Sequence, residues 1–300
     1  MILTKKAWQA EGIVPLLYGK DKDKKRASAI GPGLHSVLGL ERYFKNQSFD
    51  MDFLNPVSSF YHLKSLSTKL YLHRLENYLD PIPRESIVLD AGCGVGRFTT
   101  LLAERFKKVV AFDPSLPSLK ACQRHLEERG LHNVEMHWAD ISFLDNVGEN
   151  TFDVVIATGP ICYTADSLKS LKRLMRVAKP NAKIFLSVEG CLGALCSQGV
   201  EGPERLLNVL SRDPLLLEKD RLINYCNRKD FKELVRNAGV KKLTIDSSHD
   251  FGDGAFWQAI DDSRLNDPTY VDMIIRTEDL CRNHSVIAER ARIFMAVGEK

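Results

Sequence analysis

The residues best suited to chemistry lie in the segment 88–98, which reads V-L-D-A-G-C-G-V-G-R-F. Glycine adopts positive φ angles without steric cost and lets a ligand approach the backbone closely. An apolar strand is expected to enter this segment and a helix to leave it, so unpaired N–H groups and the positive end of a helix dipole face the loop. Such a loop suits an anionic group, either a phosphate or a carboxylate.

The glycine spacing excludes two common ligands of such loops. A dinucleotide fingerprint requires G-x-G-x-x-G. Here the glycines are Gly92, Gly94 and Gly96, and Arg97 occupies the position of the third fingerprint glycine. The phosphate-cradling pattern G-x-x-x-x-G-K-[S/T] is absent from this segment, so the loop favours neither NAD nor a nucleoside triphosphate. A glycine turn that binds nothing is the alternative, and three alternate glycines after the strand residue Asp90 argue against it.

A second carboxylate follows the next apolar run. Asp113 ends the segment V-V-A-F-D at 109–113. A carboxylate at this position of a nucleotide-binding fold can accept hydrogen bonds from both hydroxyls of a ribose. The same side chain also suits a helix N-cap before Pro114.

Two further polar positions follow later apolar runs. Asp140 and Ile141 come directly after the alternating run 134–138, and Thr158 follows the apolar run 154–157. Open α/β sheets bind ligands at the carboxyl ends of their parallel strands. These residues are therefore expected at the same edge of a sheet as the glycine loop.

Alternating strands and helices must position these residues. The expected strands are centred on 87–89, 109–112, 134–138, 154–157, 184–188, 242–245 and 293–297. The expected helices cover 56–79, a segment ending at 105, 119–126, 168–178, 230–238 and 269–281. This rhythm predicts an α/β fold with a doubly wound parallel sheet, right-handed crossovers and helices on both faces.

The domain organisation follows from the same pattern. Residues 1–85 are expected to form an N-terminal segment with a lid helix, and residues 86–300 a core with insertions at 190–227 and 247–268. Periodicity is weak in residues 1–55, so no element is predicted there.

From about Ser86 to Lys300, the order of these pieces resembles the class I S-adenosylmethionine-dependent methyltransferases, and D-x-G-x-G-x-G after a strand resembles their first motif. The resemblance implies a Rossmann-like, seven-stranded, mostly parallel sheet with the last strand antiparallel, plus an N-terminal helical segment and a cap insertion. Residues 178–183 resemble the turn before the family's fifth strand. Asn181 stands there in place of a glycine, and asparagine tolerates the left-handed conformation.

The resemblance also implies that the cofactor is S-adenosyl-L-methionine. Gly92, Gly94 and Gly96 would form the floor under its methionine portion. Asp90 would hold the loop and reach the amino group, directly or through water. Asp113 would take the ribose hydroxyls.

The remaining cofactor contacts implied by the resemblance come from four residues. Asp140 would accept from the adenine amino group, and Ile141 would pack against the ring. The backbone of Thr158 would lie beside the sulfonium. Tyr61 could close over the cofactor, although core or interface packing explains it better.

The implied chemistry is one in-line displacement at a methyl group carried by a positively charged sulfonium. The protein then mainly positions and desolvates the reactants. Some acceptors also need a general base. No motif specifies one; Tyr163, His62 and His249 are candidates, and each is better explained as a structural or surface group, so the catalytic residues stay unassigned.

The charge balance bears on the methyl acceptor. The chain has 42 basic and 39 acidic residues, for a formal net charge of +3, which is no electrostatic footprint for nucleic acid. Amino-directed nucleic-acid methyltransferases of this fold usually carry [D/N]-P-P-[F/Y], where this chain has T-G-P-I at 158–161. We therefore expect a small-molecule substrate whose methylated atom (N, O or C) is undetermined. The alternatives are an RNA or protein methyltransferase and a non-catalytic S-adenosylmethionine-binding partner subunit.

The two insertions bear on the substrate pocket. The segment 190–227 and the helix around Tyr61 contain large apolar residues that should not stand in water, so we expect them to roof the active site. A satellite core on the back of the sheet is the alternative. The second insertion, 247–268, is rich in aromatic and acidic residues, which suits an amine or another cationic substrate and equally suits a polar surface loop.

Cysteine usage and hydropathy indicate a cytoplasmic protein. The seven cysteines are odd in number and include no C-x-x-C pair, which is typical of free thiols and predicts no metal site. No apolar stretch is long enough to span a bilayer, and the N-terminus lacks the apolar core of a signal peptide. No membrane partner is expected, and the oligomeric state is not predicted.

Overall fold

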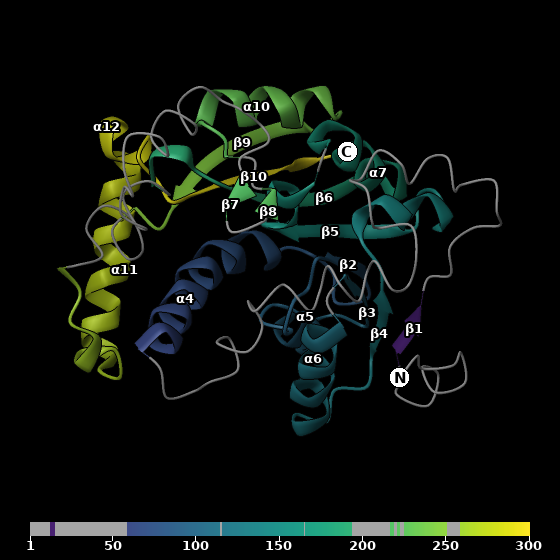
Figure 1. The fold of residues 1–300 in the computed structure, drawn as a ribbon, viewed down its shortest axis with the longest axis horizontal. Coiled ribbons are helices and arrows are strands. Elements are labelled where there is room, and N and C mark those ends of the chain that lie inside the picture. Colours follow the sequence, from purple (N-terminus) through teal and green to yellow (C-terminus); the bar gives the residue numbers. More distant parts are fainter. Residues whose placement is uncertain are drawn as a thin grey trace. The chain divides into compact units, whose positions relative to one another are not determined.

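The computed structural model describes residues 13–15, 59–114, 116–164, 166–193, 217–218, 221–222, 225–250 and 259–300 (Figure 1). The strands of these residues form a sheet in the order β1-β4-β3-β2-β5-β6-β10-β9, and β7 pairs with β8. Strand bounds are β1 Ile13–Pro15, β2 Ile87–Ala91, β3 Lys108–Asp113, β4 Val134–Trp138, β5 Phe152–Thr158, β6 Ala178–Glu189, β7 Leu217–Glu218, β8 Arg221–Leu222, β9 Lys241–Ser248 and β10 Ile293–Glu299.

Helices alternate with these strands along the chain. Their bounds are α4 Ser59–Leu79, α5 Thr99–Arg105, α6 Leu116–Glu128, α7 Ser167–Val177, α10 Arg228–Asn237, α11 Pro268–Asn283 and α12 Ser285–Ala288. Three short 3-10 helices are η3 Ile141–Asn146, η4 Pro160–Tyr163 and η6 Asp262–Arg264. Among the described residues, no helix is both long enough and apolar enough to cross a membrane.

The predicted fold class is confirmed. All seven expected strands and all six expected helices are present, and β10 runs antiparallel to both β6 and β9. When β1 is left out, the strand order is that of a Rossmann-like sheet in which β10, the last strand in the sequence, lies between β6 and β9.

Two details differ from the sequence-based expectation. Strand β1 was not predicted; it pairs in parallel with β4 over three residues, too few to produce a hydrophobic period. Residues 178–183, expected as a turn, form the first half of β6. Asn181 has φ 64° within this strand, so its left-handed conformation is confirmed although the turn is not.

The chain divides into two compact units. Unit 1 contains residues 1–55, 83–157 and 173–182, and unit 2 contains residues 56–82, 158–172 and 183–300. The expected domain boundary at residues 85 and 86 stays a prediction.

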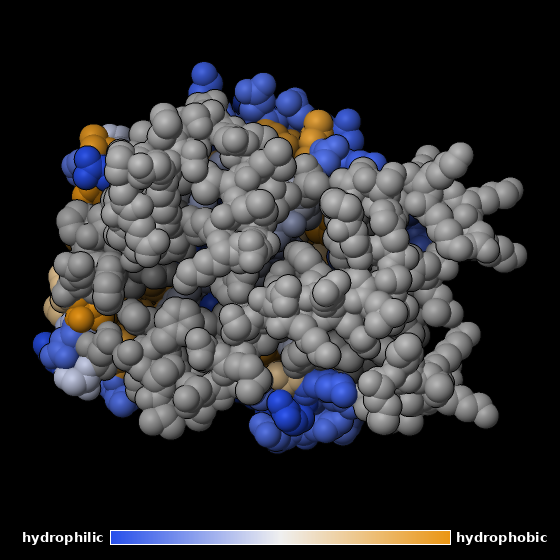
Figure 2. Space-filling view, in the orientation of Figure 1, coloured by the Kyte–Doolittle hydropathy of each residue, from blue (hydrophilic) through white to orange (hydrophobic). Residues whose placement is uncertain are grey.

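Unit 1 holds the central parallel strands. Strand β2 pairs with β3 on one side and with β5 on the other, and β3 pairs with β4. Their side chains are almost wholly buried; Val88, Val109, Ala111 and Val154 are 0% exposed. Helix α6 turns its apolar stripe inward, where Leu119, Cys122 and Leu126 are buried, while the surface at the bottom of Figure 2 is polar.

Unit 2 combines antiparallel strands with the helices α4, α10, α11 and α12. Ile293 of β10 lies opposite Glu189 of β6 and Ser248 of β9, so the carboxyl ends of β6 and β9 meet at one edge. Helices α4 and α11 lie beside each other (Figure 1). They share an apolar cluster made of Leu66, Leu70, Ile260, Leu265, Tyr270, Val271 and Ile274.

We predict that this cluster stabilises unit 2. Ile274 is 1% exposed within it, so Ile274→Ala should lower the free energy of unfolding by about 2–5 kcal/mol through lost burial and a cavity. Met273 on the same helix is 51% exposed, and Met273→Ala should change it by less than about 0.5 kcal/mol. Chemical denaturation of both variants checks this; equal losses would contradict it.

Candidate functional site

The glycine loop connects the end of β2 to the start of α5. Gly92, Gly94 and Gly96 have φ angles of 73°, 55° and 86°. Residues with a Cβ rarely adopt this region, whereas glycine enters it at no steric cost. The alternate glycines of the sequence therefore correspond to a backbone that needs them.

Strand β3 anchors this loop. The backbone N–H groups of Gly92 and Cys93 donate to the carbonyl of Phe112, at 2.8 and 3.0 Å. The N–H of Gly94 donates to Oδ2 of Asp113 at 2.8 Å, and Asp113 is 9% exposed. Three successive N–H groups of the loop are thus satisfied by the end of β3, which fixes the loop and the Asp113 carboxylate together.

One side of the loop is packed and another is open. A Cβ added to Gly96 would lie 2.6 Å from the Sγ of Cys122 on α6, so only glycine fits there. A Cβ added to Gly94 would meet no atom of the described residues within 4 Å. The loop therefore rests on α6 at Gly96 and leaves space beside Gly94 for a ligand to approach the backbone.

Asp90 is buried beneath the loop. It is 1% exposed, and its Oδ2 accepts a 2.7 Å hydrogen bond from Oγ1 of Thr99, the first residue of α5. Burial raises the pKa of Asp90 to about 6, against the lowering effects of the Thr99 hydrogen bond and the Arg97 charge. The carboxylate thus joins the strand before the loop to the helix after it.

Asp140 and Ile141 directly follow Ala139, whose backbone is hydrogen-bonded to that of Asp113 in unit 1. The N–H of Ala139 donates to the carbonyl of Asp113 at 3.2 Å. Ile141 begins η3 and is 5% exposed. Seven of the nine predicted cofactor residues (Asp90, the three glycines, Asp113, Asp140 and Ile141) therefore gather in unit 1 at the carboxyl ends of β2, β3 and β4.

The other two predicted cofactor residues belong to unit 2. Thr158 ends β5 and precedes Gly159, which has φ 91° and donates its N–H to the carbonyl of Ser187 at 3.2 Å. Tyr61 lies on α4, but its side chain is outside the described residues, as is that of His62. Their predicted roles stay predictions.

The other two candidate bases have hydrogen-bond partners. Tyr163 donates to Oε1 of Glu189 at 3.2 Å. His249 is 0% exposed, and its Nδ1 and Nε2 lie 2.8 Å from Oγ of Ser248 and 2.7 Å from Oγ of Ser67. Both ring nitrogens are therefore engaged, which fits the structural explanation of this residue.

Some residues that support these sites were not predicted from the sequence. Thr99 and Cys122 act on the loop through contacts that no spacing rule specifies. Glu278 left a readable signal: it continues the helical stripe Val271, Ile274, Glu278, Cys281, where an acidic residue replaces an apolar one. A charged residue on a buried stripe is a candidate for function.

Comparison with known proteins agrees with this geometry. Residues 88–181 match the family model described as a methyltransferase domain. Over 103 residues the chain is 34% identical to the cypemycin N-terminal methyltransferase of a Streptomyces species, covering 33% of this chain and 40% of that protein. It is 31% identical over 113 residues to a ubiquinone biosynthesis O-methyltransferase of Idiomarina loihiensis, covering 38% and 46%.

The fold has known counterparts as well. The structure of a putative S-adenosylmethionine-dependent methyltransferase of Listeria monocytogenes superposes with a TM-score of 0.53 at 15% identity, covering 79% of this chain and 99% of that chain. The sheet order and the anchored glycine loop define a class I methyltransferase fold. With this fold and this family match, residues 88–181 form a methyltransferase domain of the class I type. It spans less than half the length of the two curated relatives named above.

We predict a pH dependence of stability from Asp90. The pKa of Asp90 is raised to about 6 in the folded state, so the folded protein keeps this proton at pH values where the unfolded chain has lost it. The free energy of unfolding of the wild type therefore falls as the pH rises from about 4 to about 6. Asp90→Asn keeps an acceptor for Thr99 and cannot ionise. The free energy of unfolding of the variant relative to the wild type should therefore rise across this window, by up to about 3 kcal/mol. Urea unfolding at several pH values measures this difference, and a constant difference would contradict it.

Proposed function

We propose that this protein transfers the methyl group of S-adenosylmethionine to a nucleophilic atom of a small molecule. The observation that carries the proposal is the glycine loop fixed to β3 through Gly94 and Asp113, with open space beside Gly94. When bound, the cofactor supplies a methyl group on a positively charged sulfonium.

The loop residues fit the methionine portion of this cofactor. Gly92, Gly94 and Gly96 expose backbone rather than side chains, so a carboxylate can approach closely. Asp90 holds the loop through Thr99 and reaches the amino group, directly or through water.

Residues at the strand ends bind the ribose and the adenine of the cofactor. Asp113 takes the ribose hydroxyls while its Oδ2 holds the Gly94 N–H. Asp140 accepts from the adenine amino group and the buried Ile141 packs against the ring. In this proposal the Thr158 backbone lies beside the sulfonium, and Tyr61 closes over the cofactor.

Three observations support a small-molecule acceptor. The near balance of charge offers no attraction for nucleic acid. The loop after β5 continues as η4, Pro160–Tyr163, in place of a proline pair followed by an aromatic residue. One of the two relatives named above is, by its name, an O-methyltransferase of ubiquinone biosynthesis, which agrees with a small-molecule acceptor. The roof over the active site stays a prediction, since residues 194–216 lie outside the described residues.

Two alternatives are open to experiment. An RNA or protein methyltransferase would use the same cofactor loop with a different acceptor surface. A non-catalytic partner subunit would keep the fold and lose the cofactor contacts; the complete glycine loop and Asp113 favour an active enzyme.

We predict that S-adenosylhomocysteine binds and raises the melting temperature, because a ligand selective for the native state stabilises it. Thermal-shift measurements followed by calorimetry check this, with NADH as the comparison ligand. Binding of NADH without binding of S-adenosylhomocysteine would contradict the proposal.

Asp113→Ala tests the ribose contact. We expect a loss of about 1.5–3 kcal/mol in affinity for S-adenosylhomocysteine, roughly 10- to 150-fold in Kd, because hydrogen bonds to a charged group are lost. Unfolding should stay cooperative because the side chain lies at a strand end. Glu128→Ala, at the exposed end of α6, is the control and should leave Kd unchanged. An unchanged Kd in Asp113→Ala would show that the ribose is held elsewhere.

A further inference from the structure

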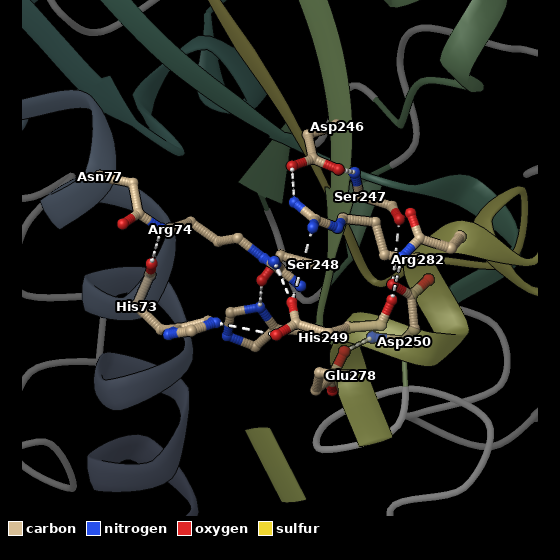
Figure 3. A network of polar contacts seen from close by, with 12 residues as sticks. His73, Arg74, Asn77, Asp246, Ser247, Ser248, His249, Asp250, Glu278 and Arg282 are labelled. Carbon is tan, nitrogen blue, oxygen red and sulfur yellow. Dashed lines mark hydrogen bonds and ion pairs between the residues drawn. The ribbon is translucent and has the colours of Figure 1, made fainter. Parts of the chain in front are cut away.

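A buried polar network lies between α4, the end of β9 and α11 in unit 2 (Figure 3). At its centre, His249, Asp250 and Glu278 are 0%, 2% and 1% exposed. The N–H of Asp250 donates to Oε2 of Glu278 at 2.9 Å, and Oγ of Ser247 donates to Oδ2 of Asp250 at 3.0 Å. Two carboxyl groups are therefore buried side by side.

The guanidinium groups of this network are engaged elsewhere. Arg74 donates to Oδ1 of Asp279 at 2.5 Å. Arg282 donates to Oδ2 of Asp246 at 2.8 Å and lies 3.6 Å from Asp279. Each of these two guanidinium groups is thus hydrogen-bonded to a carboxylate other than that of Asp250.

One oxygen of Asp250 has no partner in the part of the chain that the structure describes. Its Oδ1 is buried and accepts no hydrogen bond there. Burial and the charge of Glu278 together raise the pKa of Asp250 to about 7, against the lowering effects of the Ser247 hydrogen bond and the Arg74 charge. A buried acceptor without a partner costs free energy unless a bound group satisfies it.

We propose that Asp250 and Glu278 form the site that receives a positively charged ammonium group of the methyl acceptor. The proposal rests on the proposed function and names the chemistry of its acceptor. An ammonium group donates hydrogen bonds or, when quaternary, supplies charge alone, and either compensates a buried carboxylate.

The backbone at His249 has an uncommon conformation, which places the side chain of Asp250 in the protein interior. His249 has φ 61°, a left-handed conformation that is unfavourable for a residue with a Cβ. Hydrogen bonds between its two ring nitrogens and the hydroxyl groups of Ser248 and Ser67 stabilise it. His249 is therefore a positioning residue that turns the chain at the end of β9.

Contacts within unit 2 link this site to the loop after β5. Gly159, next to Thr158, donates to the carbonyl of Ser187, and the Tyr71 hydroxyl lies 3.2 Å from Oγ of Ser187. The Tyr71 ring lies 4.8 Å from the His249 ring, centroid to centroid. Three residues, Ser187, Tyr71 and His249, thus connect the carboxyl pair to the strand end proposed to carry the sulfonium contact.

Calorimetry with a matched pair of probes tests this site. Choline and 3,3-dimethylbutan-1-ol have the same shape and differ in charge. Each is titrated into the full chain, with and without saturating S-adenosylhomocysteine, at about pH 8. The variants are Asp250→Asn and Glu278→Gln, and the control is Asp272→Asn, which removes an exposed carboxylate from the same helix.

We expect the wild type to bind choline at least about tenfold more tightly than the alcohol, and both site variants to lose about tenfold or more in choline affinity. The control variant and the affinity for the alcohol should not change. Asn and Gln keep the shape of the replaced side chains, and thermal unfolding verifies that both variants fold.

The pH dependence of choline binding gives a second readout. The charged and titratable groups facing Asp250 are Asp246 on β9, Arg74 on α4, and Glu278 and Cys281 on α11. Because a proton and the cation compete for Asp250, choline affinity should fall about tenfold from pH 8 to pH 6, and this fall should disappear in Asp250→Asn.

Equal binding of both probes by the wild type, no binding of choline, or unchanged choline binding in Asp250→Asn would each overturn the proposal, since the pair would then hold only a proton. Failure of S-adenosylhomocysteine to bind the wild type would contradict the proposed function instead, and the titrations without it decide the cation site independently.

Discussion

The candidate cofactor site depends on one hydrogen bond, from the N–H of Gly94 to the carboxylate of Asp113. Ala91 lies opposite Phe112 where β2 and β3 pair in parallel, so both strands end at the same edge. The loop after β2 can therefore satisfy its N–H groups on the end of β3 instead of in water. A loop held this way loses little conformational freedom when a ligand binds, which favours affinity.

A different constraint governs unit 2, where carboxyl groups are buried. Asp250 and Glu278 are nearly inaccessible, and burial of an ionised carboxylate is costly. The apolar cluster shared by α4 and α11 offsets that cost and holds the helices around the network. This arrangement resembles functional sites generally, where a fold tolerates unfavourable groups because the surrounding packing over-determines their positions.

Elements with strong local patterns were predictable from sequence. The apolar runs of β2, β3, β5 and β6 and the stripe of α7 follow the periods of strand and helix, and each is present in the structure. Strand β1 was not predictable, because its three residues become a strand only by pairing with β4. Residues 178–183 show the same limit: their composition indicates a turn, but β6 continues through them with Asn181 left-handed.

The sequence alone determined the class of the protein, because the strand–loop–helix order and the alternate glycines are local features whose chemistry follows from residue type. Only the tertiary structure decided which side chains meet. Gly96 faces Cys122, Ser67 reaches His249 across 182 residues, and Asp250 meets Glu278 across 28. Such contacts need atoms placed within about 3 Å by the packing of separate elements, and no local pattern encodes that placement.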